Sequence, residues 1–518
     1  MWSENQTNIF NFVQYGTGNA IAAAVAGSGK TTTLVQAESL VSGSALFLAF
    51  GKEIAEEMKR RGVEAKTFHS LVYRAVTQFL GVKTVQMDKL DNLIKANFKN
   101  DERWIYGAFC KKLVGLARQQ GVGYLCENTT RFWEDLADLH NIELESDDGK
   151  YWRAIELSQK LLELSNQTKS ADFDDLLYFA VIYNLRLPQY DFIFVDEAQD
   201  TNAIQRELIK KLMHPNSRLL AVGDKAQAIY GFRGADSNSL SLIEKEFNCI
   251  TLPLDVSYRC PRSVVEYANQ WVPEIKHAPA AIEGVVSHLN EWELSRFQPA
   301  DLIICRTTKP LISMAFKLIS QRIPAYVMGR EIGQGMKSLI NKIIKRNKVK
   351  NLAELRAGLN QWKDEEVAAL SLSNKPEKIE VVIDKVQAIE GVIEGLESTD
   401  AQGLTDLEAA IDYLFLEKSN AVILCTIHKS KGLEAGRVYW LNRNACPSKW
   451  AKKDWQVQQE YNLCYVATTR AQKELFIIEE EGLKSSVKAK EIKRDVEKVF
   501  KDKINGAIAD IYSFENED

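Results

Sequence analysis

The chain has 518 residues, of which 45% are hydrophobic and 26% charged, and its formal net charge is −4. This length exceeds what one hydrophobic core supports and predicts roughly three to four compact units. The small net charge provides no general basic field, so contact with nucleic acid would need a local patch or groove.

No segment reads as a secretory signal, and no apolar run approaches the ~18–20 residues that cross a bilayer, so we expect no membrane attachment. The eight cysteines are scattered, without a C-x-x-C pair. This pattern predicts reduced thiols in a cytoplasmic protein and argues against a zinc ribbon or a disulfide framework.

The first candidate functional element is AAAVAGSGKTTTL, at residues 22–34, where an apolar run leads into a helical stretch. Lys30 can reach the β- and γ-phosphates of a nucleotide, and the Thr31 hydroxyl can hold Mg²⁺. A ligand-free glycine-rich turn is the alternative, which the order of strand, loop, Lys-Thr pair and helix disfavours. Ala24 stands where the generic pattern has a glycine. The backbone N–H groups that can surround a β-phosphate belong to Ala26, Gly27, Ser28 and Gly29.

Two kinds of segment alternate along the chain. Short apolar runs such as SALFLAF, DFIFVDEAQD and RLLAVGD, and later ADLIICR, AVILCTIH and KELFIIEE, are typical of strands buried on both faces of a parallel sheet. Residues 76–169 and 331–419 have helical spacing and little strand signal. We therefore predict an α/β protein with two parallel-sheet cores, each interrupted by a helical insertion.

A pair of acids follows the predicted strand FIFV, in the sequence FIFVDEAQD. Parallel sheets bind their ligands at the carboxyl ends of their strands, which is where Asp196 and Glu197 are expected. Asp196 can hold Mg²⁺ through water, and Glu197 can orient and deprotonate an attacking water. An acidic N-cap turn is the alternative, and the presence of two acids in a chain with a phosphate loop disfavours it.

The order of these and later motifs resembles the UvrD/Rep/PcrA-like superfamily 1A DNA helicases. The likeness extends over AGSGKT, FLAFGKEIAEEMKRRG with AKTFHSL, DFDDLL, DEAQD, VGDKAQAIYGFRGA, VSYRCP, TIHKSKGLEAGRVYW and EYNLCYVATTRAQKELF. Ala24 matches the family form of the loop.

The resemblance implies two RecA-like cores and four segments. The first, ATP-binding core comprises residues 1–75 and 170–240, with the helical insertion 76–169. The second core comprises residues 241–330 and 420–518, with the small helical insertion 331–419. We expect no nuclease-like domain after the last motif.

The resemblance also implies roles around ATP and Mg²⁺. Gln6 reads the adenine edge, Tyr258 stacks on adenine, and Glu434 contacts the ribose. Gln227 senses the γ-phosphate, while Arg259 and Arg470 neutralise charge that develops on it. The residues expected to act in catalysis are Lys30, Glu197, Gln227, Arg259 and Arg470. Those expected to bind the nucleotide, besides the loop residues above, are Gln6, Thr31, Thr32, Tyr258, Gly432 and Glu434.

A single-stranded DNA track is implied as well. Tyr230 and Phe232 share one face of an extended segment and are suited to base stacking, although the family more often has Trp at the second position. For these two and for His69 and His428, a structural role is the alternative. The family positions that line the track are Phe50, Thr67, His69, Tyr230, Phe232, Arg306, Thr426 and His428.

We therefore predict an ATP- and Mg²⁺-dependent 3′→5′ DNA helicase or single-strand translocase acting at single-strand/duplex junctions. Two alternatives remain: a DNA-stimulated ATPase that needs a partner subunit to unwind, and a nucleotide-gated DNA-binding scaffold. The small second insertion and the sequence GREIGQGMKSL at its start depart from the family pattern and bear on unwinding, not on ATP hydrolysis.

Overall fold

The computed structural model describes residues 2–140, 142, 144, 150–229, 238–372, 376–397 and 403–483. The chain divides into two compact units, Met1–Val256 and Ser257–Asp518. Each unit is built around its own parallel sheet, which confirms the predicted α/β class.

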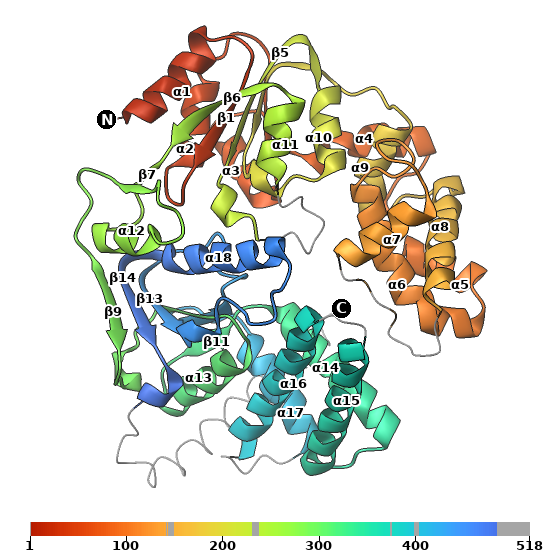
Figure 1. The fold of residues 1–518 in the computed structure, drawn as a ribbon, viewed down its shortest axis with the longest axis vertical. Coiled ribbons are helices and arrows are strands. Elements are labelled where there is room, and N and C mark those ends of the chain that lie inside the picture. Colours follow the sequence, from red (N-terminus) through yellow and green to blue (C-terminus); the bar gives the residue numbers. More distant parts are fainter. Residues whose placement is uncertain are drawn as a thin grey trace, which may run out of the picture. The chain divides into compact units, whose positions relative to one another are not determined.

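The first unit contains a six-stranded sheet with the order β3-β2-β4-β5-β1-β6 (Figure 1). All neighbouring strands are parallel. The strands are β1 (Asn19–Ala24), β2 (Ala45–Ala49), β3 (Ala65–Thr67), β4 (Tyr190–Val195), β5 (Met213–Gly223) and β6 (Cys249–Leu254).

The helices of this unit fall into a group around the sheet and an inserted bundle. The group around the sheet comprises α1 (Glu4–Tyr15), α2 (Lys30–Glu38), α3 (Lys52–Arg60), α4 (Phe68–Leu80), α9 (Phe173–Ile182), α10 (Ala203–Lys211) and α11 (Ser239–Glu246). The bundle comprises α5 (Lys89–Asn97), α6 (Asn100–Gln119), α7 (Thr130–Leu139) and α8 (Tyr151–Gln167). Two 3₁₀ turns, η1 (Ala198–Asp200) and η2 (Lys225–Gln227), follow β4 and β5.

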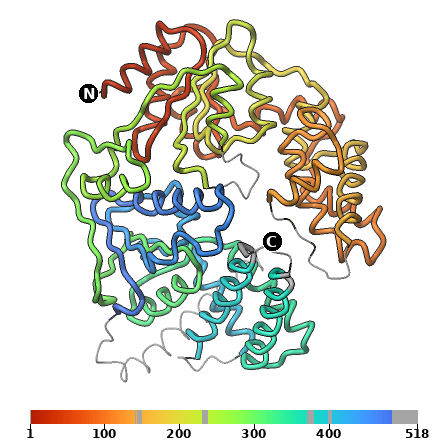
Figure 2. The backbone as a smooth tube through the Cα atoms, viewed as in Figure 1, coloured from red at the N-terminus to blue at the C-terminus, as the bar shows by residue number. Residues whose placement is uncertain are grey.

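Helices cover both faces of the first sheet because its strands are apolar on both faces. Phe47 and Phe194 pack with α1, α2 and α3 on one face. Leu46 and Ile193, from the same two strands, belong to the core on the other face, which continues through α4 and α9 into the bundle. Figure 2 shows the chain leaving the sheet after β3 and returning to β4 through α9.

The acids of DFDDLL anchor this bundle to α9. Asp175 is buried and accepts from Lys89 Nζ at 2.6 Å, and Asp172 accepts from Arg118 at 2.9 Å. These ion pairs connect α9 with α5 and α6. The buried charges are tolerated because each one is paired with an opposite charge.

The expected boundary of the first core at residue 240 is wrong in one respect. β6 (Cys249–Leu254), the ITLPL segment assigned to the second core, pairs with β1 from Asn19↔Cys249 to Ala24↔Leu254. The first sheet therefore extends to Leu254, because the free edge of β1 accepts one further parallel strand.

The second unit contains another six-stranded parallel sheet, with the order β11-β12-β10-β13-β14-β9. Its strands are β9 (Val285–Leu289), β10 (Leu302–Cys305), β11 (Ala325–Val327), β12 (Val422–Thr426), β13 (Ala435–Leu441) and β14 (Ala471–Ile478). A separate two-stranded sheet is formed by β7 (Val256–Ser257) and β8 (Lys276–His277).

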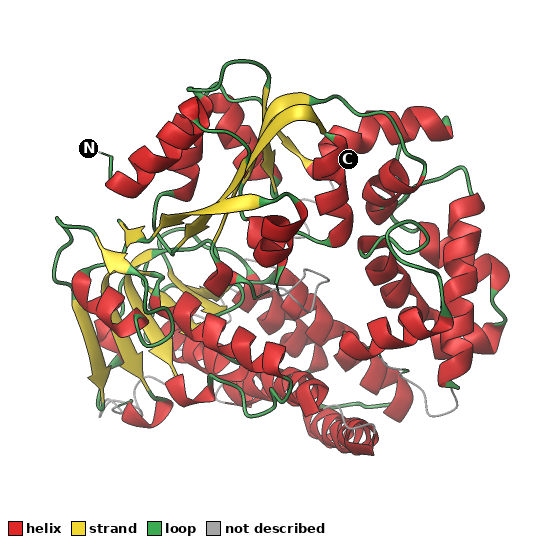
Figure 3. Ribbon diagram, turned by 45° about the horizontal axis from the view of Figure 1, so that its top comes forward, coloured by secondary structure: helices red, strands yellow, loops and turns green. Residues whose placement is uncertain are grey.

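Helices of the second unit pack with its sheet into one core. That core runs through α13 (Lys309–Ser320), α14 (Arg330–Asn347), α16 (Pro376–Glu397) and α17 (Leu404–Phe415) and reaches strand residues such as Ile303 and Leu424. Figure 3 shows the helices in red and the strands in yellow. The helices are α12 (Arg262–Ala268), α13 (Lys309–Ser320), α14 (Arg330–Asn347), α15 (Leu352–Leu372), α16 (Pro376–Glu397), α17 (Leu404–Phe415) and α18 (Asp454–Thr468), with 3₁₀ turns η4 (Leu294–Arg296), η5 (Arg443–Ala445) and η6 (Glu480–Gly482). Among the described helices, none combines the length and the apolar character needed to cross a membrane.

Candidate active site

The phosphate loop connects β1 to the first residue of α2, Lys30. Gly27 and Gly29 have φ angles of 71° and 77°, which lie in the left-handed region that favours glycine. A loop that alternates in this way turns successive N–H groups toward one point, where an anion can bind. The positive end of the α2 dipole lies at the same place.

The acid pair and the loop meet at the carboxyl edge of the first sheet. Lys30 Nζ lies 2.9 Å from Glu197 Oε1, and the Thr31 hydroxyl donates to Asp196 Oδ2 at 3.1 Å. Glu197 has a φ of 47°, an uncommon conformation for a residue with a side chain, and it follows Asp196 directly after β4. The residues predicted as phosphate ligand, metal ligands and base are therefore neighbours in space.

Burial and neighbouring charges shift the pKa values of the ionisable side chains at this edge. Asp196 is only 2% exposed, and desolvation together with the nearby Glu197 raises the pKa of its carboxyl to about 6, against the opposing pull of Lys30. Burial also raises the pKa of Asp224, again opposed by Lys30. For Lys30, burial favours the neutral form, but Glu197, Asp196 and Asp224 outweigh it and raise the pKa of the ammonium group. The ammonium group of Lys30 thus interacts electrostatically with three carboxylates.

The residues present fit a magnesium–nucleotide complex. The hydroxyl oxygen of Ser28 is buried in the loop without a hydrogen-bond partner, so a phosphate oxygen would supply one. A divalent cation beside Thr31 and Asp196 would supply positive charge to a site rich in carboxylates. The hydroxyl of Thr31 and the carboxylate of Asp196 offer the oxygen ligands that Mg²⁺ prefers.

Gln6 lies against this loop from α1. Its side chain caps the helix by accepting from Ser3 N, and its Nε2 donates to Thr33 Oγ1 at 3.0 Å. A Cβ added to Gly29 would lie 3.6 Å from that Nε2, an ordinary van der Waals distance, so Gln6 lies directly beside the loop. Thr32, the other candidate in this stretch, is exposed on α2.

Gln227 follows β5 and is tied to the same edge. Its Nε2 donates to Asp224 Oδ2 at 2.7 Å, and the backbone N–H of Asp224 donates to Gln199 Oε1 at 3.1 Å. Gln199 also donates to Glu197 Oε2 at 2.5 Å. Gln199 is not among the site residues predicted from the sequence, although its place in DEAQD, two residues after Glu197, was a signal.

In the second unit, the two candidate arginines converge on the loop that contains Gly432. Arg259 pairs through Nε with Glu434 Oε2. Arg470 is buried and donates through Nη1 to the carbonyl of Leu433 at 3.0 Å. Gly432 has a φ of 90°, which permits this turn. Glu434 also accepts from Gln472, so one short loop joins Arg259, Arg470 and the predicted ribose contact.

Tyr258 precedes Arg259 and is 47% exposed. An exposed aromatic ring beside an arginine is suited to stacking on a base. Its predicted role is compatible with this exposure.

The DNA candidates of the first unit lie at the carboxyl ends of β2 and β3. Phe50 follows β2 and packs edge-on against Phe68, with ring centroids 5.7 Å apart. Thr67 caps α4 by accepting from Ser70 N. His69 stacks on Phe173 at 4.0 Å. Phe173 lies within DFDDLL but is not among the site residues predicted from the sequence.

The DNA candidates of the second unit lie at the carboxyl ends of two paired strands, since Cys305, the last residue of β10, is opposite Thr426, the last residue of β12. The hydroxyl of Thr426 accepts from Lys429 N. His428 follows in the next turn and faces the charge of Glu460. Tyr230 and Phe232 lie outside the residues that the structure describes.

Arg306 has a more buried setting than its predicted DNA contact suggests. Its guanidinium donates to both carboxylate oxygens of Glu460, with Nη2–Oε1 at 2.7 Å, and to Glu380 Oε2 at 3.0 Å. Glu460 belongs to α18 and Glu380 to α16. The structure therefore places Arg306 in an ion triad within the second unit.

Comparison with known proteins agrees with this geometry. A family model described as UvrD/REP helicase N-terminal domain matches residues 2–248. This range contains the phosphate loop, the acid pair and Gln227. The chain is UvrD/Rep/PcrA-like.

Curated relatives support the family likeness of this UvrD/Rep/PcrA-like chain. It is 25% identical over 499 residues to F-box DNA helicase protein 1 of Schizosaccharomyces pombe, covering 88% of this chain and 55% of that protein. It is 25% identical over 299 residues to the ATP-dependent DNA helicase PcrA of Leuconostoc citreum, covering 50% and 37%. A probable DNA helicase II homolog of Mycoplasma pneumoniae is 23% identical over 596 residues, covering 90% and 82%. The chain thus spans about half or less of the length of the first two.

Proposed function

We propose that this UvrD/Rep/PcrA-like chain is a DNA motor that hydrolyses ATP with Mg²⁺, moves along single-stranded DNA and unwinds duplex from a junction. The observation that carries the proposal is the arrangement at the edge of the first sheet. Lys30 lies 2.9 Å from Glu197, and Thr31 contacts Asp196. The names of the relatives, DNA helicases among them, support the choice of DNA.

Each residue in this arrangement then has a chemical role. Lys30 and the loop N–H groups hold the β- and γ-phosphates, and Thr31 and Asp196 would hold Mg²⁺, which would supply charge neutralisation when bound. Glu197 orients and deprotonates the attacking water. Gln6 holds the base, and Gln227 responds to the γ-phosphate.

The second unit is proposed to supply the positive charge that neutralises negative charge developing on the γ-phosphoryl group. Arg259 and Arg470 act on the γ-phosphoryl group, with Tyr258 and Glu434 on the nucleoside. Their convergence on the loop around Leu433 supports a shared role, because movement of that loop would move both arginines together.

The DNA track remains a proposal that rests on the family likeness. Phe50, Thr67 and His69 at one sheet edge, and Thr426 and His428 at the other, would contact the strand without reading its sequence. Movement is proposed to run 3′→5′. The segments 76–169 and 331–419 are proposed as the two insertions, with the cytoplasm as the compartment.

Strand displacement on duplexes with a 3′ or a 5′ tail tests the proposal, with Lys30→Ala as the inactive control. Unwinding from the 3′ tail only, dependent on ATP and on Lys30, is expected. Unwinding from the 5′ tail only would overturn the polarity. DNA-stimulated ATP hydrolysis without unwinding would favour a translocase that needs a partner subunit, and DNA binding without hydrolysis would favour a scaffold.

A further inference from the structure

Gln199 connects two strand ends of the first sheet. Gln199 is only 2% exposed. Its Nε2 donates to Glu197 Oε2 at 2.5 Å, and its Oε1 accepts from the backbone N–H of Asp224 at 3.1 Å. The two partners determine the orientation of the amide, because a carboxylate only accepts and a backbone N–H only donates.

The connection continues from Asp224 to Gln227. Asp224 Oδ2 accepts from Gln227 Nε2 at 2.7 Å, and Oδ1 accepts from Ala226 N at 3.0 Å. Lys30, Glu197, Gln199, Asp224 and Gln227 therefore form a continuous chain of polar contacts. This chain runs from the phosphate loop through the proposed base to the proposed γ-phosphate sensor.

The backbone around Gln199 is shaped for this contact. A Cβ added to Gly223, the last residue of β5, would lie 2.5 Å from Gln199 Oε1, so any side chain there would displace the amide. The carbonyl of Ala198, which precedes Gln199, accepts from the hydroxyls of Thr201 and Ser239. These bonds hold the turn that presents Gln199.

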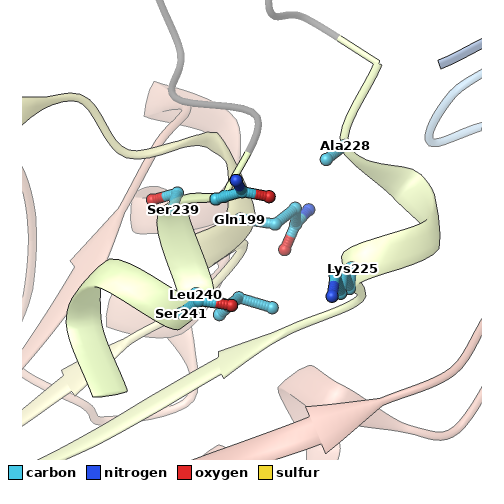
Figure 4. A pocket seen from close by; sticks show the side chains of 7 residues that line it. Gln199, Lys225, Ala228, Ser239, Leu240 and Ser241 are labelled. Atoms are coloured by element: carbon cyan, nitrogen blue, oxygen red, sulfur yellow. The ribbon is translucent and has the colours of Figure 1, made fainter. Parts of the chain in front are cut away.

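Figure 4 shows Gln199 in the space between α11, which carries Ser239, and η2, which carries Lys225. Gln199 lines a small pocket together with residues of both elements. The side chain of Gln199 therefore lies beside η2, the turn that ends in Gln227.

We propose that Gln199 is a positioning residue that couples the proposed base Glu197 to the sensor Gln227. Both carboxylate oxygens of Glu197 are held here, Oε1 by Lys30 and Oε2 by Gln199. When phosphates attract Lys30, Gln199 keeps its hold on the carboxylate and transmits the position of Gln227 through Asp224. The inference rests on the proposed ATP hydrolysis.

Gln199→Met tests this role, because methionine has a similar length and lacks the amide. Gln205→Met is the matched control, since Gln205 is a buried glutamine of the same unit whose amide caps α10. We expect Gln199→Met to lower kcat for DNA-stimulated ATP hydrolysis roughly 10- to 100-fold, as for a lost hydrogen bond to a charged group. The KM for ATP and the affinity for a fluorescent ATP analogue should change less than about two-fold, and Gln205→Met should retain kcat.

A double variant separates coupling from packing. If Gln199 acts through the polar contacts that lead to Gln227, the two substitutions should not add. The kcat of the double variant Gln199→Met, Gln227→Met should then lie within about three-fold of the kcat of the slower single variant. Multiplication of the two losses, or a normal kcat for Gln199→Met, would overturn the inference. If Gln199→Met does not fold, Gln199→Glu, which removes the donor to Glu197 at equal size, must show the same kcat loss. A wild-type chain without ATP hydrolysis would instead overturn the proposed function.

Discussion

Lys30 Nζ lies 2.9 Å from Glu197 Oε1, so the phosphate-loop lysine at the start of α2 and the proposed base just after β4 form an ion pair. Phosphates compete with Glu197 for the same ammonium group. Nucleotide binding would thus draw Lys30 toward the phosphates and leave Glu197 to act on water. Binding and activation of the base are connected through one side chain.

Replacing the base should separate binding from turnover. Glu197→Gln retains size and hydrogen bonding but cannot accept a proton, so kcat should fall about 10²- to 10⁴-fold, while ATP affinity remains within a few-fold. Glu207→Gln on α10 is the control, because Glu207 forms an ion pair with Lys210 on its own helix. Steady-state kinetics and ATP-analogue titration measure both quantities. Retention of kcat in Glu197→Gln would rule out this residue as the base.

The arginine that pairs with Glu434 should matter for turnover. Arg259→Ala removes charge from the developing γ-phosphate and should lower kcat about 10³-fold or more. Arg262, which is exposed on α12, provides the matched control and should keep kcat within about two-fold when changed to alanine. Equal effects of the two substitutions would show that Arg259 contributes only general charge.

Arg306 should contribute mainly to stability. Arg306→Gln leaves Glu460 and Glu380 without their shared partner in a buried site, which should cost about 3–5 kcal/mol in the free energy of unfolding. Lys337→Gln breaks a more exposed pair with Asp412 in the same unit and should cost less than about 1 kcal/mol. Denaturant unfolding compares them. Full stability with weakened DNA binding in Arg306→Gln would instead support a direct DNA contact.

His69 should be neutral at physiological pH. Burial lowers the pKa of its imidazole to about 4, whereas the unfolded chain titrates near 6.5. As the pH falls from 6.5 to 4, the unfolded state takes up the proton first, so stability is lost across this window. His69→Gln should therefore lose less stability than the wild type between pH 7 and pH 5, as measured by denaturant unfolding. His277, which is exposed and is changed in the same way, is the matched control.

The fold class could be predicted because the strands are short, apolar runs that end in polar motifs. Val195 is followed by Asp196, and Gly223 by Asp224, so the sheet edge that gathers the acids was foreseeable. The sequence did not reveal which sheet receives a strand. The segment 250–254 has a strand pattern, but its pairing with β1 depends on a free edge formed elsewhere.

Contacts between distant residues were beyond prediction from pattern alone. Glu380 and Glu460 lie 74 and 154 residues from Arg306, and nothing local to Arg306 indicates them. Gln199 was visible in DEAQD, yet its bond to Asp224 depends on how closely η1 approaches the end of β5. Residue roles that follow one strand were predictable, and side-chain networks across several elements were not.

ATP turnover with and without single-stranded DNA tests the central claim most directly, using the wild-type chain beside Lys30→Ala. The account predicts Mg²⁺-dependent hydrolysis that rises with added single-stranded DNA to a plateau, and no stimulated hydrolysis in Lys30→Ala. A wild-type rate that does not change when single-stranded DNA is added would contradict it.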